Sequence, residues 1–210
     1  MKNTDRSLNA LISHLGLRDD FISELIEEDD WSFVIKLHAL FEAACTHLLL
    51  YHFKEPNLAQ ILNRLPLSDG QIGKIYFLNK LELIGKDTLK YIVSLSELRN
   101  KLVHDIETIQ FSFNNLIKGF DKQQMERFAI SFSPTDSILR KLSNNPKLQK
   151  DTSLMTLSQR SSLENCILRA KKNPKVYVYG GAIQVLATIV DMYSYSDYKN
   201  WKKAKDEQIE

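Results

Sequence analysis

The chain has 210 residues, with 28 Lys and Arg side chains against 26 Asp and Glu, and 43% of its residues are hydrophobic. A formal charge of +2 excludes the simple electrostatic signature of a strongly basic nucleic-acid binder, and the hydrophobic content excludes global disorder. Only seven glycines and five prolines are present, which favours an all-α protein with few tight turns.

The longest predicted helix follows Asp29 and Asp30, whose carboxylates suit a helix N-terminus. Apolar residues then recur at helical spacing until Pro56 ends the run. The members of this stripe are Val34, Leu37, Phe41, Ala44 and Leu48. The pattern predicts one long helix, over about 33–53, with a wholly apolar face.

Further helices are predicted along the rest of the chain. Ser68 and Asp69 suggest a helix that runs to Leu83, before Gly85, and the next helix runs from Asp87 to about His104. Other predicted helices cover 122–132, 161–171 and 175–195, and a long loop is predicted at 143–158.

Within the last of these helices, Gly180 and Gly181 are expected to let another helix approach closely. The whole chain is predicted to form a single helical domain, 1–210, with a bundle at 29–120 and additional helices at 121–210.

Cysteine usage and hydropathy indicate the compartment. Cys45 and Cys166 form no C-x-x-C pair, which is typical of a reducing environment. The N-terminal residues lack the apolar core of a secretory signal, and Gly180-Gly181, Gln184 and Asp191 interrupt the most apolar stretch, 176–193. We therefore expect a cytoplasmic protein with no membrane partner.

Common catalytic and ligand-binding motifs do not occur in the sequence. His38, Cys45 and His52 are seven residues apart, about 10 Å of helical rise per step, so they are too far apart to share one metal ion. There is no H-E-x-x-H, no glycine-rich phosphate loop and no G-x-S-x-G. No metal or other cofactor is predicted.

The residues with the clearest chemical potential lie at the end of the 87–104 helix, in the sequence Glu97-Leu98-Arg99-Asn100-Lys101-Leu102-Val103-His104-Asp105. At about 100° per residue, Asn100 and His104 share a face, with Ser96 and Glu97 one turn earlier. Arg99 lies about 140° from His104 on an ideal helix, so the two would not touch within one straight helix. They could converge if the helix ends at His104, or if a second copy of the same helix supplies the partner groups. On spacing alone, cationic side chains that complement the helix dipole are the simpler interpretation.

The sequence R-N-K-L-V-H resembles the signature of the HEPN superfamily: an arginine followed by a polar residue, and a histidine a few residues later. Asn100 occupies the polar position. The long helix at 33–53, the stretch PLSDGQIGKIYFLNKLELIG and the Arg/His helix together resemble the mannitol operon repressor family, as does GAIQVLATIVDMY near the C-terminus. The resemblance is clearest over residues 30–110, whereas 133–172 has no counterpart.

This resemblance implies a HEPN-like antiparallel helical bundle and a metal-independent endoribonuclease, acting as a toxin or a phage-defence effector. In that interpretation His104 is the acid and base, Arg99 binds the scissile phosphate, and Asn100 orients either His104 or the phosphate. The neighbouring substrate-binding residues would be Lys101, Glu97 and Ser96. The resemblance also implies a homodimer with two motifs at one cleft, RNA as substrate, and an antitoxin or regulatory protein as partner.

Two observations limit this interpretation. Ile106 stands where HEPN toxins that are paired with a nucleotidyltransferase antitoxin carry a tyrosine, which argues against that pairing. The wider likeness to the mannitol operon repressor family favours a non-catalytic regulator that acts through protein contacts. Whether the chain is an enzyme stays open at this point, with a slight preference for the nuclease.

The C-terminal segment combines lysines with aromatic residues. Tyr198 and Trp201 are interleaved with lysines, an arrangement that can bind RNA by charge and stacking. A solvated chain terminus is the simpler interpretation. The lysines concerned are Lys199, Lys202, Lys203 and Lys205.

Overall fold

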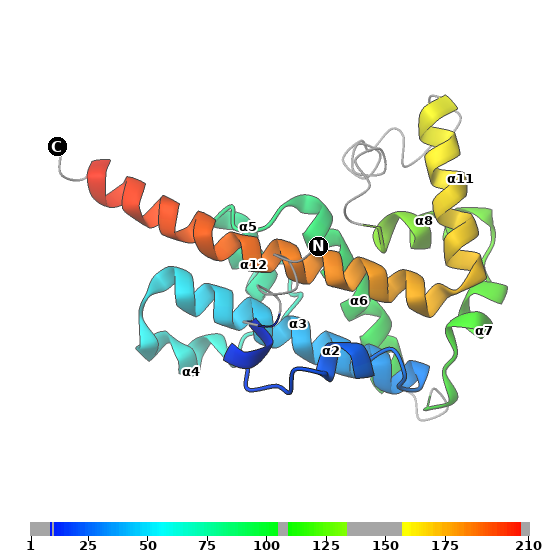
Figure 1. Cartoon of the computed structure of the whole chain (residues 1–210), viewed down its shortest axis with the longest axis horizontal. Helices are drawn as coiled ribbons and strands as arrows, with labels where there is room; N and C mark the ends of the chain where they lie inside the picture. Colours follow the sequence, from blue (N-terminus) through cyan, green and yellow to red (C-terminus); the bar gives the residue numbers. More distant parts are fainter. Residues whose placement is uncertain (1–8, 10, 105–108, 134–156, 207–210) are drawn as a thin grey trace. The chain divides into compact units, whose positions relative to one another are not determined.

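The structure is a computed structural model that describes residue 9 and residues 11–104, 109–133 and 157–206, with the backbone alone at 157–159, 203 and 206. Every regular element in these ranges is a helix, which confirms the all-α prediction (Figure 1). In chain order the elements are α2 (Phe21–Glu24), α3 (Asp30–Phe53), the 3-10 helix η1 (Pro56–Leu58), α4 (Ala59–Leu62), α5 (Lys74–Lys80), α6 (Lys86–Val103), α7 (Phe113–Lys118), α8 (Lys122–Ser131), α11 (Leu157–Lys172) and α12 (Pro174–Asp206).

The chain divides into two compact units, each built from segments that are distant in the sequence. Unit 1 comprises residues 1–21, 39–85 and 186–210, and unit 2 comprises residues 22–38 and 86–185. The long helices α3 and α12 each contribute their N-terminal part to unit 2 and their C-terminal part to unit 1. These boundaries do not follow the predicted division at residue 120, and the HEPN-like arrangement of the 29–120 region stays a prediction.

Helix α3 begins and ends where its sequence predicts. The N–H of Ser32 donates to Asp29 Oδ1 at 2.9 Å, so Asp29 caps the first turn, and hydrogen bonding from Ser32 lowers the pKa of this carboxyl. All five residues of the predicted apolar stripe are buried. The helix ends at Phe53, and Lys54 adopts a positive φ of 54° shortly before Pro56.

In unit 1, the C-terminal part of α3 lies alongside the C-terminal part of α12. Three hydrogen bonds join the two helices, and residues further along α3 bond to residues further along α12. The two helices therefore run parallel. This pair joins a helix of the predicted bundle to one of the additional C-terminal helices, so it does not test the antiparallel packing predicted within the bundle. The bonded pairs are His47 with Tyr193, Tyr51 with Asp197 and His52 with Asn200, at 2.7, 2.6 and 3.0 Å.

The helix predicted over 68–83 is wrong in extent, because only α5 within it is α-helical. Asp69 Oδ1 accepts hydrogen bonds from the N–H groups of Gln71 and Ile72, both at 2.8 Å, and this local bonding forms a turn in place of the first helical turns. At the other end, Glu82 has a positive φ of 57°, which stops the helix before Gly85.

The core of unit 2 includes two buried tyrosines whose hydroxyls are satisfied by backbone carbonyls. Tyr91 of α6 donates to Val178 O at 2.7 Å, and Tyr177 of α12 donates to Ala129 O at 2.8 Å. The Tyr91 ring also packs edge-on against Phe132, with ring centroids 5.2 Å apart. These bonds tie α6, α8 and the start of α12 together without leaving a buried phenol unpaired.

The close approach predicted for the glycine pair occurs at Gly181 alone. A Cβ at Gly181 would lie 2.4 Å from Phe132 O and 2.7 Å from Tyr91 Cε2, whereas a Cβ at Gly180 would meet nothing within 4 Å. Gly181 is therefore required where the chain at the end of α8 crosses α12 in unit 2.

Helix α12 is longer than its sequence pattern predicts. It begins at Pro174, where the missing N–H costs no helical hydrogen bond, and Asn173 Oδ1 accepts the N–H of Val176 at 3.1 Å. It continues past Tyr195 to Asp206, although its apolar side chains there are exposed. Rings three residues apart pack against one another along this end. Tyr195 and Tyr198 are stacked with centroids 6.4 Å apart, and Tyr198 and Trp201 are tilted with centroids 6.1 Å apart.

Two helical stretches, α3 and residues Pro174–Lys202 of α12, are long and apolar enough to cross a membrane by length and composition. The apolar window of α3 is 61% buried inside the protein, and that of α12 is 39% buried. The predicted loop at 143–158 lies almost entirely outside the described residues, as does Ile106.

Candidate functional site

The motif selected from the sequence occupies the last turns of α6 in unit 2. Leu95, Leu98 and Leu102 anchor one side of the helix in the core. On the remaining surface Arg99 is half-buried and Asn100 is exposed. His104 follows the last helical residue, Val103, and is exposed as well. Burial of the leucines thus leaves the three candidate catalytic side chains accessible.

The structure brings two of these three side chains together. Arg99 Nη1 donates to Asn100 Oδ1 at 3.2 Å. In the part of the chain that is described, no ion pair includes Arg99 or His104, and no hydrogen bond joins His104 to either of the other two side chains. The guanidinium is therefore available to an anion from solution.

The predicted substrate-binding residues divide into two groups. Glu97 and Lys101 are exposed on α6 and remain accessible to a ligand. Ser96 is only 1% exposed, and its hydroxyl donates to Ile92 O at 2.9 Å. The prediction that Ser96 binds substrate is therefore wrong for this structure, because its side chain bonds the preceding helical turn instead.

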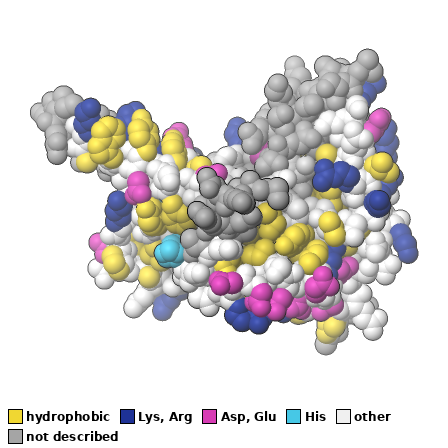
Figure 2. Space-filling view, viewed as in Figure 1, with side chains coloured by type: hydrophobic (Ala, Val, Ile, Leu, Met, Phe, Trp, Pro, Cys, Tyr) yellow, Lys and Arg dark blue, Asp and Glu magenta, His cyan; other side chains and the backbone are white. Residues whose placement is uncertain are grey.

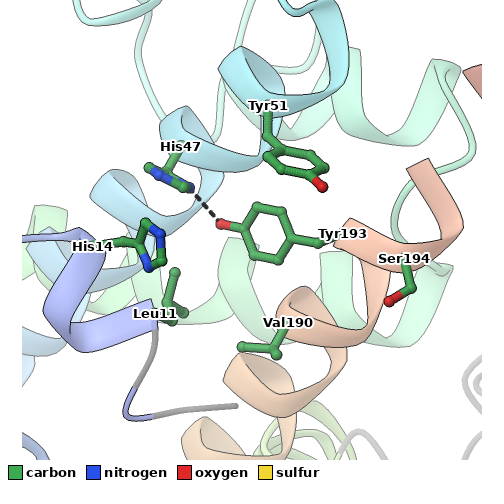
Figure 3. Close-up of a pocket in the computed structure, with 7 residues that line it drawn as sticks. All are labelled: Leu11, His14, His47, Tyr51, Val190, Tyr193 and Ser194. Atoms are coloured by element: carbon green, nitrogen blue, oxygen red, sulfur yellow. Dashed lines mark hydrogen bonds between the residues drawn. The ribbon is translucent and has the colours of Figure 1, made fainter. Parts of the chain in front are cut away.

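A second candidate site, which the sequence did not reveal, is a pocket of about 430 Å³ in unit 1 (Figure 3). Leu11 and Val190 form aliphatic walls, and Tyr51 and Tyr193 supply aromatic walls. The two tyrosine rings meet edge to face, with centroids 4.8 Å apart. The walls therefore come from α3, from α12 and from the helical turn at residues 11–14.

Two imidazoles and a serine complete the lining of this pocket. His47 Nδ1 and the Tyr193 hydroxyl are 2.7 Å apart, and Figure 3 shows that hydroxyl pointing toward His47. His14 packs edge-on against His47, with centroids 5.6 Å apart, and Ser194 is exposed. A shallower hollow of about 420 Å³ shares both imidazoles.

Burial sets the protonation state of the hydrogen-bonded pair. It lowers the pKa of His47, and the nearby His14 lowers the same pKa further. Burial also raises the pKa of the Tyr193 hydroxyl. Near neutral pH both groups are therefore uncharged.

The pocket was missed because its members are distant in the sequence. His47 and Tyr51 are four residues apart on α3, and Tyr193 and Asp197 are four apart on α12, so each pair is visible as a helical neighbour pair. Nothing in the sequence indicates that these two helices lie side by side. The seven-residue spacing of possible metal ligands on α3 includes His38 and His52 but not His47.

The aromatic and basic end of α12 is a further surface that the sequence singled out. Tyr198 is 53% exposed and Trp201 is 59% exposed, and Figure 2 shows hydrophobic and basic side chains together at this end of the helix. Lys199 donates to Leu81 O at 2.8 Å and to Glu82 Oε2 at 3.0 Å, so its charge is engaged within unit 1. Lys202 and Lys205 are exposed, and the side chain of Lys203 is outside the described part. Among the described residues, no group of three or more His, Cys, Asp or Glu side chains is arranged to hold a metal ion.

Two histidines of α3 make stability depend on pH. Burial lowers the pKa of His47 and of His52, and His14 adds to the effect at His47, while Lys199 and Lys54 add to it at His52. Since the unfolded chain binds these protons more readily, the stabilisation is complete above the ordinary histidine pKa of 6.5 and is lost as the pH falls below it.

We therefore expect the free energy of unfolding to decrease between about pH 7.5 and 5.5, by an amount measurable in urea titrations. The double variant His47→Gln/His52→Gln should lose most of this pH dependence. Asp29, Asp69 and Asp197 do not contribute in this window, because their lowered pKa values place their titration at more acidic pH. An unchanged slope in the double variant would contradict the assignment.

Protein-family models, curated proteins and solved structures were compared with the chain, and none of them matches it. The resemblance of the Arg99–His104 motif to HEPN proteins therefore stays an expectation from the sequence.

Proposed function

We propose that the chain is a HEPN-type, metal-independent endoribonuclease that uses Arg99, Asn100 and His104. The observation that carries the proposal is the accessibility of all three side chains at the end of α6, with Arg99 and His104 outside any ion pair of the described residues. A structural role for this arginine and histidine would instead place them in buried salt bridges. A catalytic role requires them to be open to solvent.

The chemistry assigned to these residues is transesterification. The 2′-hydroxyl of RNA attacks the adjacent phosphorus, the bond from phosphorus to the 5′-oxygen of the next nucleotide breaks, and the proton lost by the 2′-oxygen is balanced by one gained at the 5′-oxygen. An imidazole can accept and donate protons near neutral pH, which is the role of His104. Arg99 stabilises the charge on the non-bridging phosphoryl oxygens in bidentate form. Asn100, bonded to the guanidinium, orients Arg99.

The proposed active form is a homodimer. His104 lies just beyond the end of α6, and within the described residues of one chain no hydrogen bond joins it to Arg99. A second copy of α6 across a two-fold axis supplies the missing partner groups. Two exposed apolar side chains close to the motif in the sequence support self-association: Val103 is 39% exposed and Ile109 is 58% exposed.

The proposed location is the cytoplasm. Cys45 and Cys166 are both buried, and neither forms a disulfide within the described residues. Burial raises the pKa of Cys45 to about 12, so this thiol stays protonated and unreactive. Free buried thiols are typical of a reducing compartment.

The first test is incubation of the purified full chain with a mixture of cellular RNAs in excess EDTA. We expect cleavage by the wild type and a loss of at least about 100-fold in the Arg99→Ala variant, because a fixed cation is removed from the transition state. Arg127→Ala is the matched control, since Arg127 is exposed on α8 of the same unit and should leave the rate unchanged. If neither the wild type nor the control cuts RNA, the proposal fails and a regulator acting through protein contacts becomes the better account.

A further inference from the structure

The pocket in unit 1 has the size and walls of a site for a small flat molecule. Its volume of about 430 Å³ lies toward the lower end of the range of about 300–1,000 Å³ for small-molecule sites. Tyr51, Tyr193 and His47 meet at steep angles, with interplanar angles of 86° for the two tyrosines and 71° for His47 and Tyr193. A bound aromatic ring would find both ring faces and ring edges on these walls, and Leu11 and Val190 add aliphatic contact.

The electrostatics of the pocket select an uncharged ligand. None of the described residues that line it is a lysine, arginine, aspartate or glutamate. The His47–Tyr193 pair is neutral near physiological pH, because burial lowers the pKa of the imidazole and raises that of the phenol. An ionised ligand would leave water without gaining a lysine, arginine or carboxylate counter-charge from the described lining residues, which is costly.

The hydrogen-bonded pair of His47 and Tyr193 also determines which polar group a ligand must carry. A neutral imidazole carries one N–H and a phenol carries one O–H, and the bond between His47 Nδ1 and the Tyr193 hydroxyl uses one of these two hydrogens. If the phenol donates, the imidazole Nε2–H remains; if the imidazole donates, the phenol O–H remains. In both tautomers the pair therefore keeps one donor for a ligand acceptor.

We propose that this pocket binds an uncharged aromatic heterocycle of nucleobase size with a hydrogen-bond acceptor, a ring nitrogen or a carbonyl, on its edge. The ring packs with the Tyr51–Tyr193 pair on one side and the aliphatic walls on the other. Its acceptor accepts a hydrogen bond from the donor that the His47–Tyr193 pair keeps. The site lies in unit 1, whereas Arg99 and His104 belong to unit 2, so the proposal does not depend on the ribonuclease proposal.

Two nearly isosteric probes test the acceptor requirement by calorimetric titration of the full chain. Benzimidazole has a ring nitrogen acceptor and indole does not, and both are uncharged at about pH 8, where a histidine of ordinary pKa is neutral as well. We expect saturable binding of benzimidazole, about threefold to tenfold tighter than indole, which corresponds to one hydrogen bond. The double variant His47→Phe/Tyr193→Phe should bind the two probes equally. The anion benzoate should not bind.

A steric pair of variants tests the location. Ser194 is exposed at the pocket, so Ser194→Trp should block entry without disturbing the core and weaken benzimidazole binding by more than about tenfold. Asp191→Trp places the same ring on an exposed position of α12 outside the lining and should bind like the wild type. Absence of saturable binding in the wild type, equal affinity for benzoate, or equal affinity in the two tryptophan variants would each overturn the proposal.

Discussion

Replacing His104 by alanine is expected to abolish RNA cleavage while leaving the fold intact. In the proposed reaction this imidazole moves the protons of the 2′-oxygen and the 5′-oxygen, and such a group contributes about 100- to 10,000-fold to a rate. Because His104 is exposed and lies beyond the last residue of α6, its truncation removes no core contact. The free energy of unfolding should therefore change by less than about 0.5 kcal/mol.

The measurement for this prediction is the initial cleavage rate of one labelled RNA, with urea unfolding of the same preparations. Gln110→Ala provides the control, since Gln110 is also exposed on the surface of unit 2. Equal rates for the wild type and the His104→Ala variant would contradict the catalytic role. A loss of activity that follows a loss of helical signal would assign His104 to the fold instead.

Gly181→Ala is expected to destabilise unit 2, whereas the neighbouring Gly180→Ala should not. The added methyl group at Gly181 would meet Phe132 O at 2.4 Å, and a backbone carbonyl moves only with its chain. Overpacking of this kind costs about 1–3 kcal/mol. At Gly180 the same methyl group meets nothing within 4 Å, so replacing glycine inside a helix should stabilise by about 0.5–1 kcal/mol.

Urea titrations of the two alanine variants test this contrast directly, because the substitutions are chemically identical and adjacent. The midpoint of Gly181→Ala should fall and that of Gly180→Ala should stay or rise. Equal shifts in both variants would show that the chain does not approach α12 at Gly181 as the structure places it. Restoration of stability to Gly181→Ala by a smaller residue at Tyr91 is not expected, since the shortest contact is with the backbone.

The parts of the fold that follow local rules were predictable from the sequence. Asp29 marks the start of α3 because its carboxylate caps the first turn, and Pro56 marks its end because proline lacks a backbone N–H donor. Both effects act within a few residues. The helix predicted at 68–83 shows the limit of this reasoning. There the Asp69 carboxylate bonds the N–H groups two and three residues later and forms a turn, an alternative that the same residue types permit.

Features that depend on distant segments were not predictable. The parallel pairing of α3 and α12 in unit 1 joins residues such as His47 and Tyr193. The local sequence pattern of each helix predicts that helix but does not indicate which helix packs against it. The pocket between these side chains is a consequence of that pairing. The accessible positions of the half-buried Arg99 and of the exposed Asn100 and His104 agree with their helical spacing. The burial of Ser96 depends on the core that α6 contacts.

The chemistry of the product ends tests the central claim most directly. A single RNA cut by the purified chain in excess EDTA should yield a 2′,3′-cyclic phosphate on the upstream fragment and a 5′-hydroxyl on the downstream fragment, and a 2′-deoxy sugar at the cut site should prevent cleavage. These ends require attack by the 2′-oxygen, which is the step assigned to His104 and Arg99. Fragments with a 5′-phosphate, or cleavage that EDTA abolishes, would contradict the account.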